Sequence, residues 1–281
     1  MNITLSFVLV TLALVFAAAI GLGLVLHRVH VRQSASDKPA DPLGGDGMSG
    51  AIGFIGGAAA FLLGVLMLAS LDHYNATKAV VAEEALAYSA AFDSTDGLAP
   101  KDQGVMQRDL ICLMRSVATN SWAAAEAEDL RGSANTHSWR RRTSDHADEV
   151  DPKTKAQEDS LDNLQSELIN ASKSGQQRLL AAEGDLPLAL WILVFVSIFA
   201  LISILTALLR FHPSRTLAIT SLAATLMIST AMVFTLTTFD EPFNKKDGVF
   251  ISPRALNAVL VRLQGTYPEA GWGPCEAVAD T

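Results

Sequence analysis

The chain has 281 residues, of which half are hydrophobic and 18% are charged. In soluble proteins about a quarter of the residues are charged, so this composition favours a membrane protein. The formal net charge of −8 argues against a nucleic-acid-binding protein, which would carry a basic surface. Two cysteines are too few for a disulfide framework or for a zinc site built from cysteines.

Four stretches that contain no charged residue and no histidine are long enough to cross a bilayer, which takes about 20 apolar residues per helix. They cover residues 3–26, 51–71, 186–209 and 217–239. The runs lack the alternation of strands, and an open sheet could not satisfy its backbone in lipid. We therefore predict an all-α membrane protein with four transmembrane helices. A cleaved signal peptide is the alternative for the first stretch, but no Lys or Arg precedes it.

The polar segments between these spans differ in character. Residues 27–50 are predicted to be a flexible loop and residues 240–281 a C-terminal tail. Residues 72–185 are predicted to be a helical aqueous insert, within which the charged stretch 137–155 shows no apolar period and favours an exposed loop. Apolar residues at helical spacing in the insert are Met106, Leu110, Leu113, Met114 and Val117, followed later by Leu161, Leu164, Leu168 and Ala171.

The second span has no predicted end at the membrane surface. No Gly or Pro occurs between Gly64 and Gly97, so a single helix can run from Ala51 to about Phe92, a length of about 60 Å. Such a helix would belong to the membrane part and to the insert at once. We therefore predict one composite domain over residues 1–281.

The orientation in the membrane follows from the flanking charges. Four spans place both termini and the insert on the same side of the bilayer. Arg28 and Arg32 follow the first span and Arg210 and Arg215 lie between the third and fourth, so the positive-inside rule puts the insert outside the cytoplasm of a plasma-membrane protein. The bias is small, because lysines and arginines also lie close to the spans on the opposite side.

The two cysteines are predicted to lie on the same side of the membrane. A disulfide between Cys112 and Cys275 is therefore topologically possible. Because Cys112 lies in an apolar helical run, where a free cysteine behaves as a small hydrophobe, we expect two separate thiols.

Several short patterns occur in a fixed order along the chain and can be compared with known families. The set consists of Val80, Val81, Glu84 and Ala85 after the second span, Trp122 preceded by Ser121, Arg178-Leu179, Leu186-Pro187 and Trp191 at the third span, Phe239-Asp240-Glu241-Pro242-Phe243, and Ile251-Ser252-Pro253. In this order it resembles the bestrophin-like family of unknown function, whose four-span proteins are remotely similar to bestrophin anion channels. The family has an acid before the Trp, where this chain has Ser121.

The resemblance implies a homo-oligomer, a pentamer in true bestrophins, with a pore lined by the second span. Carried over, the candidates for an apolar pore constriction are Phe54, Phe61 and Leu68, which repeat every seven residues. Apolar constrictions can gate by dewetting. Lipid contact or ordinary helix packing is the competing interpretation of the same stripe.

Small residues in the second span predict close helix packing. Gly53, Gly57 and Gly64 repeat at spacings of four and seven residues, and such residues allow helices to approach closely in lipid. The partner could be another helix of the same chain or of a second subunit.

Two departures weaken the anion-channel interpretation. Bestrophins of animals carry an acidic calcium clasp after the last span, whereas this chain has only Asp240-Glu241 before Pro242, so we predict no calcium site. Residues 72–185 contain 12 Lys and Arg against 20 Asp and Glu, a net charge of 12 − 20 = −8 that would repel anions. Bestrophins also hold this insert in the cytosol, opposite to the orientation predicted above.

No pattern of enzyme chemistry is present. The chain has no Gly-rich phosphate loop, no His-Glu-x-x-His and no Gly-x-Ser-x-Gly, and no charge lies inside a span. We predict no catalytic residue, metal or cofactor. The main hypothesis is an oligomeric ion channel in the lipid bilayer, and the alternative is a non-conducting scaffold or sensor whose insert binds a partner.

Overall fold

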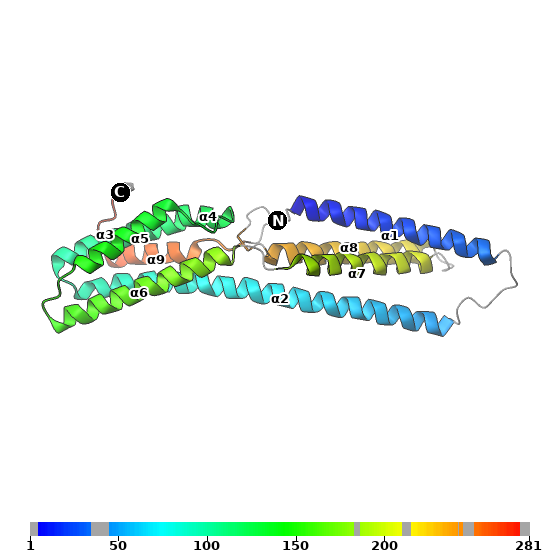
Figure 1. The fold of residues 1–281 in the computed structure, drawn as a ribbon, viewed down its shortest axis with the longest axis horizontal. Helices are drawn as coiled ribbons and strands as arrows, with labels where there is room; N and C mark the ends of the chain where they lie inside the picture. The colour runs from blue at the N-terminus through cyan, green and yellow to red at the C-terminus, as the bar shows by residue number, and fades with distance from the viewer. Residues whose placement is uncertain are drawn as a thin grey trace. The chain divides into compact units, whose positions relative to one another are not determined.

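The computed structural model of the chain describes residues 5–34, 45–182, 186–209, 215–240, 242–243 and 250–275. These residues are mostly helical and contain no strand, which confirms the all-α prediction. The helices, shown in Figure 1, are α1 (Leu5–Ser34), α2 (Gly45–Ser94), α3 (Pro100–Ser116), α4 (Trp122–Glu126), α5 (Ala134–Glu149), α6 (Lys155–Leu180), α7 (Leu188–Leu209), α8 (Arg215–Asp240) and α9 (Arg254–Thr266). A 3-10 turn (Thr95–Gly97) follows α2, and a π-helical turn (Val117–Ser121) joins α3 to α4.

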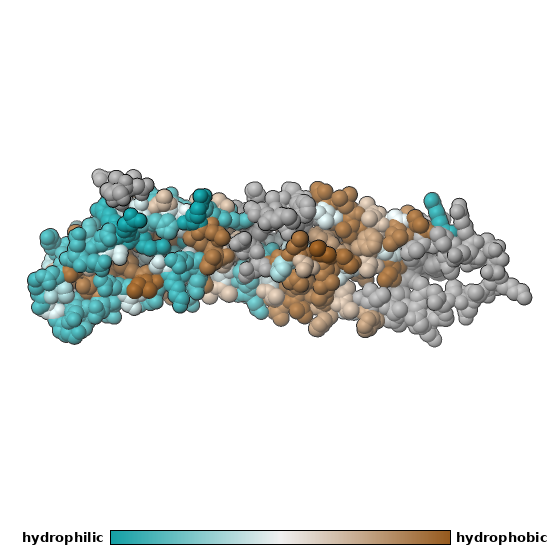
Figure 2. All heavy atoms as spheres, viewed as in Figure 1, coloured by the Kyte–Doolittle hydropathy of each residue, from teal (hydrophilic) through white to brown (hydrophobic). Residues whose placement is uncertain are grey.

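The chain folds as two compact units. Unit 1 comprises residues 1–72 and 185–240, and therefore contains α1, the first part of α2, α7 and α8. Hydrophobic side chains cover much of its described surface, as Figure 2 shows for one face. Its buried core consists of Leu12, Ala19, Leu63, Leu66, Trp191, Val194, Ile198, Ile202, Val233 and Leu236.

Among the described residues, three helices are long and apolar enough to cross a membrane. They are the helical stretches Gly56–Gly97, Leu188–Thr206 and Ile219–Asp240, which overlap the second, third and fourth predicted spans. In α1 the described apolar stretch, Val10–Val25, is shorter than a full span. The connection between the third and fourth spans, residues 210–214, lies outside the described residues.

In unit 1, helices α1 and α7 pack closely against each other. A Cβ atom added to Gly23 would lie 2.7 Å from Cβ of Thr206 and 3.1 Å from the carbonyl oxygen of Ser203. The hydroxyls of Ser203 and Thr206 donate hydrogen bonds to carbonyls one turn earlier in α7, so these polar groups are satisfied within their own helix. A glycine in α1 therefore allows the two backbones to approach.

The prediction of a long second helix is confirmed, because α2 is continuous from Gly45 to Ser94. It begins earlier and α1 ends later than expected, so residues 27–34 and 45–50 are helical rather than part of a flexible loop. Residues 35–44 lie outside the described residues.

Unit 2 comprises residues 73–184 and 241–281. The two predicted apolar stripes lie in its core, which includes Met106, Leu110, Leu113, Met114, Val117, Leu161, Leu164 and Ala171. The prediction of an exposed loop at 137–155 is wrong, because α5 occupies residues 134–149. The physical reason is a buried stripe of Trp139, Thr143 and Ala147, each four residues apart, with the Thr143 hydroxyl bonded to the Trp139 carbonyl at 2.8 Å.

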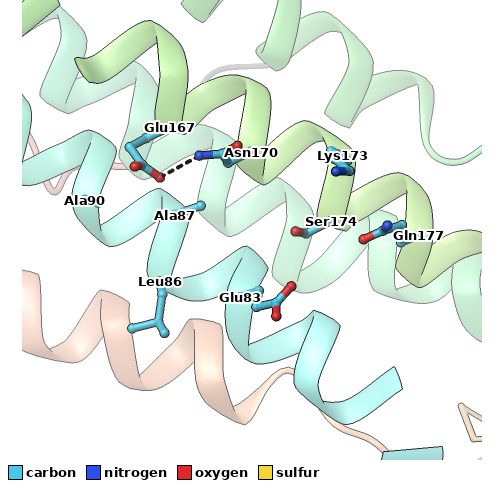
Figure 3. A pocket seen from close by; sticks show the side chains of 9 residues that line it. All are labelled: Glu83, Leu86, Ala87, Ala90, Glu167, Asn170, Lys173, Ser174 and Gln177. Atoms are coloured by element: carbon cyan, nitrogen blue, oxygen red, sulfur yellow. Dashed lines mark hydrogen bonds between the residues drawn. The ribbon is translucent and has the colours of Figure 1, made fainter. Parts of the chain in front are cut away.

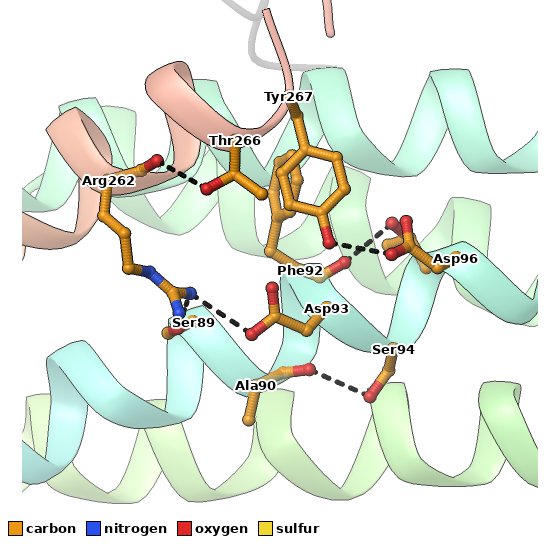
Figure 4. A network of polar contacts seen from close by, with 10 residues as sticks. Ser89, Ala90, Phe92, Asp93, Ser94, Asp96, Arg262, Thr266 and Tyr267 are labelled. Atoms are coloured by element: carbon orange, nitrogen blue, oxygen red, sulfur yellow. Dashed lines mark hydrogen bonds and ion pairs between the residues drawn. The ribbon is translucent and has the colours of Figure 1, made fainter.

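The C-terminal tail folds back onto unit 2. Helix α9 buries Leu256 and Leu263 in the core. Figure 4 shows how its far end is held: Arg262 forms an ion pair with Asp93 at 3.2 Å, and the Tyr267 hydroxyl donates to Asp96 at 2.7 Å. This bond, together with burial and the negative charge of Asp96, raises the pKa of Tyr267 to about 12.

The expectation of two separate thiols is wrong, because Cys112 and Cys275 form a disulfide. The tail brings their Cα atoms to 5.6 Å, within the usual range for a disulfide. Arg108 and Arg115, which lie on the same face of α3 as Cys112, hold the tail on either side. Their guanidinium groups donate to backbone carbonyls of Gly271, Trp272, Gly273 and Pro274.

Candidate functional site

The predicted pore residues lie on one exposed stripe of α2. The exposed fractions of Phe54, Phe61 and Leu68 are 78%, 75% and 59%. Each step of seven residues nearly completes two helical turns, so the three side chains lie almost in line. The buried residues of the same segment occupy the opposite side of the helix: Ala59, Leu63, Leu66 and Ser70.

The three predicted packing glycines lie beside this stripe. Apart from the chain neighbours of each glycine and the backbone of its own helix, no atom of the described chain lies within 4 Å of a Cβ placed on Gly53, Gly57 or Gly64. The described chain therefore does not use them for close packing, in contrast to Gly23. The stripe is apolar, has a row of small residues along it, and lacks a protein partner among the described residues.

A second cluster of functional interest lies inside unit 2 and centres on an ion pair. Arg178 of α6 and Glu84 of α2 are 1% and 2% exposed. The Arg178 Nε–H donates to Oε2 of Glu84 at 2.7 Å, and Nη2 approaches Oε1 at 3.4 Å. Because removal of either partner would leave the other charge buried alone, this pair strongly constrains how α6 meets α2.

The same guanidinium also binds the start of α4. Nη2 donates to the Ser121 hydroxyl at 2.9 Å, and the Trp122 ring lies 4.8 Å from the Arg178 Cζ atom, a distance suited to a cation–π contact. Phe243 of the tail packs on Trp122 edge to face, with ring centroids 5.5 Å apart. One arginine thus joins α2, α4, α6 and, through Trp122, the tail.

Gly175 makes room for the ion pair. A Cβ atom at this position would lie 2.7 Å from Oε1 of Glu84 and 3.4 Å from Nη2 of Arg140. A larger residue at 175 would therefore displace the carboxylate that neutralises Arg178.

A groove lies between α2 and α6 in the same unit. Its volume is about 540 Å³. Figure 3 shows Glu83 on one side and Ser174 and Gln177 on the other, with Ala87 and Ala90 along α2. The lining is mostly polar, and Leu86 adds an exposed apolar side chain at its edge.

In unit 1, the ends of two predicted spans are joined by one hydrogen bond. The backbone N–H of Leu186 donates to Oδ1 of Asp240 at 3.0 Å. The carboxylate at the end of α8 therefore lies near the N-terminus of α7, where the helix dipole favours a negative charge.

Comparison with known proteins gives one match. The family model of the bestrophin-like domain matches residues 13–255, which is most of the chain. The chain belongs to the bestrophin-like domain family. No curated protein and no solved structure matches it. Together with the three apolar helices, the family identifies a membrane protein.

The residues that carried the family resemblance meet in space. Within unit 2, the bestrophin-like patterns supply Glu84, Ser121, Trp122, Arg178 and Phe243, all of which belong to the buried cluster. Within unit 1, Leu186 and Asp240 form the bond at the ends of α7 and α8. These patterns therefore mark contacts that hold each unit together rather than the exposed stripe of α2.

Sequence reasoning missed three features of this bestrophin-like chain. Gly23 was passed over, although Ala19 and Gly23 have the spacing of small residues that pack helices. The disulfide could not be deduced, because the course of the tail was unknown. The role of Arg178 was also missed, since its partners Glu84 and Ser121 are 94 and 57 residues away in the chain.

Proposed function

We propose that the protein is a homo-oligomeric ion channel whose pore is lined by the second span. The observation that carries this proposal is the exposed stripe Phe54, Phe61 and Leu68, which lies opposite the packed face of α2. Membership of the bestrophin-like family and the apolar helices support it. One copy of the stripe cannot enclose a pore, so several copies must meet.

The constriction would be formed by rings of these side chains. Residues seven apart on a helix are separated by about 10 Å along its axis, so three rings would follow one another along the span. A narrow ring of phenylalanines excludes water unless it widens, and this is the basis of gating by dewetting. The glycines beside the stripe would allow neighbouring second spans to approach closely.

The proposed topology has four spans, with the insert, the tail and both termini on one side of a plasma membrane. The Cys112–Cys275 disulfide supports the pairing of α7 and α8 as spans, because a disulfide requires the insert and the tail to share a compartment. Disulfides persist in oxidising compartments. This supports the extracytoplasmic orientation that the positive-inside rule also favours.

The net charge of the insert bears on ion selectivity. Residues 72–185 carry 12 basic and 20 acidic residues, so the insert repels anions at long range. We therefore expect a conductance in which anions have no large advantage over cations at low ionic strength, where screening is weak.

The experiment that tests the channel proposal is reconstitution of the purified full chain in planar bilayers. We expect single-channel currents, and a higher conductance or open probability in Phe61→Ala, because the ring becomes wider and less apolar. Ile192→Ala is the matched control, since Ile192 is an exposed apolar residue of α7 that lies off the stripe. Absence of current, or identical currents in the wild type and Phe61→Ala, would overturn the proposal.

Orientation is tested separately with a cysteine introduced at the exposed position Arg141. In intact cells, a membrane-impermeant maleimide is expected to label Arg141→Cys, while Cys112 and Cys275 stay unlabelled because they are joined. Labelling only after cell lysis would place the insert in the cytoplasm.

A second candidate function is a non-conducting scaffold or sensor. The α2–α6 groove favours it, because its polar lining and the exposed Leu86 provide a surface on which a partner could bind. Light scattering on the purified protein separates the two candidates. A monomer or dimer cannot build a central pore from one second span per subunit, whereas a larger ring can.

A further inference from the structure

A second cavity, a slot of about 340 Å³, opens between α5 and α6 of unit 2. Its polar lining includes Arg140 and Ser144 from α5 and Ser172 from α6. Leu168 and Ile169 of α6 add an apolar wall. The proposed pore uses none of these residues, so the slot has no role in the function proposed above.

The lining of the slot holds one basic residue, Arg140, and one acidic residue, Asp148. The Arg140 guanidinium lies beside the buried cluster, because its Nη2 atom and Oε1 of Glu84 would lie 3.4 Å and 2.7 Å from a Cβ atom placed on Gly175. Glu84 already receives hydrogen bonds from Arg178 at both of its oxygens. Among the described residues Arg140 forms no ion pair of its own. Arg140 is half-buried and its side chain lines the slot.

A half-buried guanidinium of this kind suits a carboxylate. Arginine offers two parallel N–H donors that match the two oxygens of a carboxylate. The hydroxyls of Ser144 and Ser172 line the same slot and can donate further hydrogen bonds. Asp148, which also lines the slot and accepts from Gln165 at 3.3 Å, adds a negative charge that disfavours ligands with two negative charges.

The apolar wall indicates the rest of the ligand. Ile169 is 67% exposed in a helix whose other exposed residues are mostly polar. Leu168 packs against the core and supplies the inner part of the wall. An alkyl group lying on these two side chains would remove apolar surface from water, at about 25 cal/mol per Å².

We propose that the α5–α6 slot binds a monocarboxylate with a short alkyl chain, with the carboxylate on Arg140 and the chain on Leu168 and Ile169. The ligand is a soluble organic acid of the compartment that the insert faces. Binding there would stabilise the α5–α6 pair next to the buried ion pair. The stability of unit 2 would then depend on the concentration of the ligand.

The test is calorimetric titration of the full chain in lipid nanodiscs with sodium hexanoate, at constant ionic strength. We expect saturable binding, at least about tenfold weaker in Arg140→Gln, because a charge-assisted bidentate contact is lost. Arg141→Gln is the matched control: it removes the neighbouring exposed arginine and should leave the affinity unchanged. Failure of the wild type to bind, or equal binding by Arg140→Gln, would overturn the proposal.

The apolar part of the site has its own test. Ile169→Ser should weaken binding of hexanoate several-fold and leave acetate binding nearly unchanged, since only the longer acid reaches the apolar wall. This variant keeps the proposal testable if Arg140→Gln does not fold. Equal affinity for acetate, sulfate and hexanoate in the wild type would contradict the proposed ligand class.

Discussion

At the scale of single residues, Arg178 is the most constrained side chain of unit 2. It is buried, its positive charge is matched by Glu84, and its other donors are satisfied by the hydroxyl and the carbonyl of Ser121. Where this chain has Ser121, the family resemblance led us to expect an acid.

The buried pair gives a first prediction. Arg178→Met should lower the free energy of unfolding by about 3–5 kcal/mol, because it leaves the Glu84 carboxylate buried without a partner. The double variant Glu84→Gln/Arg178→Met should recover part of this loss. Denaturant unfolding of the full chain, followed by tryptophan fluorescence, measures both.

The control for this pair is an exposed one. Lys155→Met removes the ion pairs of Lys155 with Glu158 and Asp159 on the surface of α6, and should change stability little. A loss of stability in Lys155→Met as large as that in Arg178→Met would show that the loss in Arg178→Met does not come from burial of the ion pair.

The raised pKa of Tyr267 predicts that the stability of the fold depends on pH. Its pKa is about 12 in the folded chain and about 10 when unfolded, so the folded state holds its proton more tightly. The stabilisation that Tyr267 gives to the folded state is therefore fully present below pH 10 and is lost as the pH rises towards 12. Comparison of thermal unfolding of the wild type and Tyr267→Phe over this range isolates the effect. A constant difference between the two would contradict it.

Residue patterns alone could not reveal these contacts. The sequence singled out Glu84, Trp122 and Arg178 only as parts of a family resemblance, and their meeting depends on how three separate helices pack. The stripe Phe54, Phe61 and Leu68 was predictable, because it follows from helical spacing alone. Its exposure in one chain agrees with a pore and with lipid contact alike.

At the scale of helices, unit 1 depends on close contact between α1 and α7. Gly23 lies at this contact, since a side chain there would collide with Thr206. The glycines of α2 have open space instead. Small residues at regular spacing therefore predict that close packing is possible, but not which helix provides the partner.

Gly23→Ala tests this contact. Overpacking should cost about 1–3 kcal/mol, visible as a lower midpoint in detergent unfolding. Gly21→Ala is the matched control two residues earlier, where a Cβ atom meets nothing within 4 Å. Equal midpoints for the two variants would argue against a tight α1–α7 contact.

The tail is the element whose fold was least predictable. Its prolines and its lack of a long apolar run suggested a simple tail, yet α9, the two arginines of α3 and the disulfide attach it to unit 2. The prediction for α5 failed for a related reason: Thr143 counts as polar in the sequence but is buried through its bond to the Trp139 carbonyl. The length of α2 was predictable, because no helix-breaking residue interrupts it.

Removal of the disulfide should loosen the tail. Cys275→Ser is expected to cost about 2–4 kcal/mol of stability, because the bond closes a long loop. Wild-type protein treated with a dithiol reductant should unfold at the same midpoint as the variant. Alkylation of both cysteines in unreduced, folded protein would show that the bond is absent.

At the scale of the whole molecule, the bestrophin-like chain has an apolar helical unit and a second helical unit, and the long helix α2 contributes residues to both. Unit 1 exposes the stripe of α2, and in unit 2 a buried ion pair and a disulfide hold the helices and the tail together. The central claim is that copies of the stripe meet around a pore.

That claim is tested most directly by thiol modification of Phe61→Cys channels during current recording. The native cysteines are joined to each other, so the introduced thiol reacts alone. We predict that a water-soluble methanethiosulfonate changes the current through Phe61→Cys and not through Ile192→Cys. Unchanged current in Phe61→Cys, or an equal effect at Ile192→Cys, would contradict a pore lined by α2.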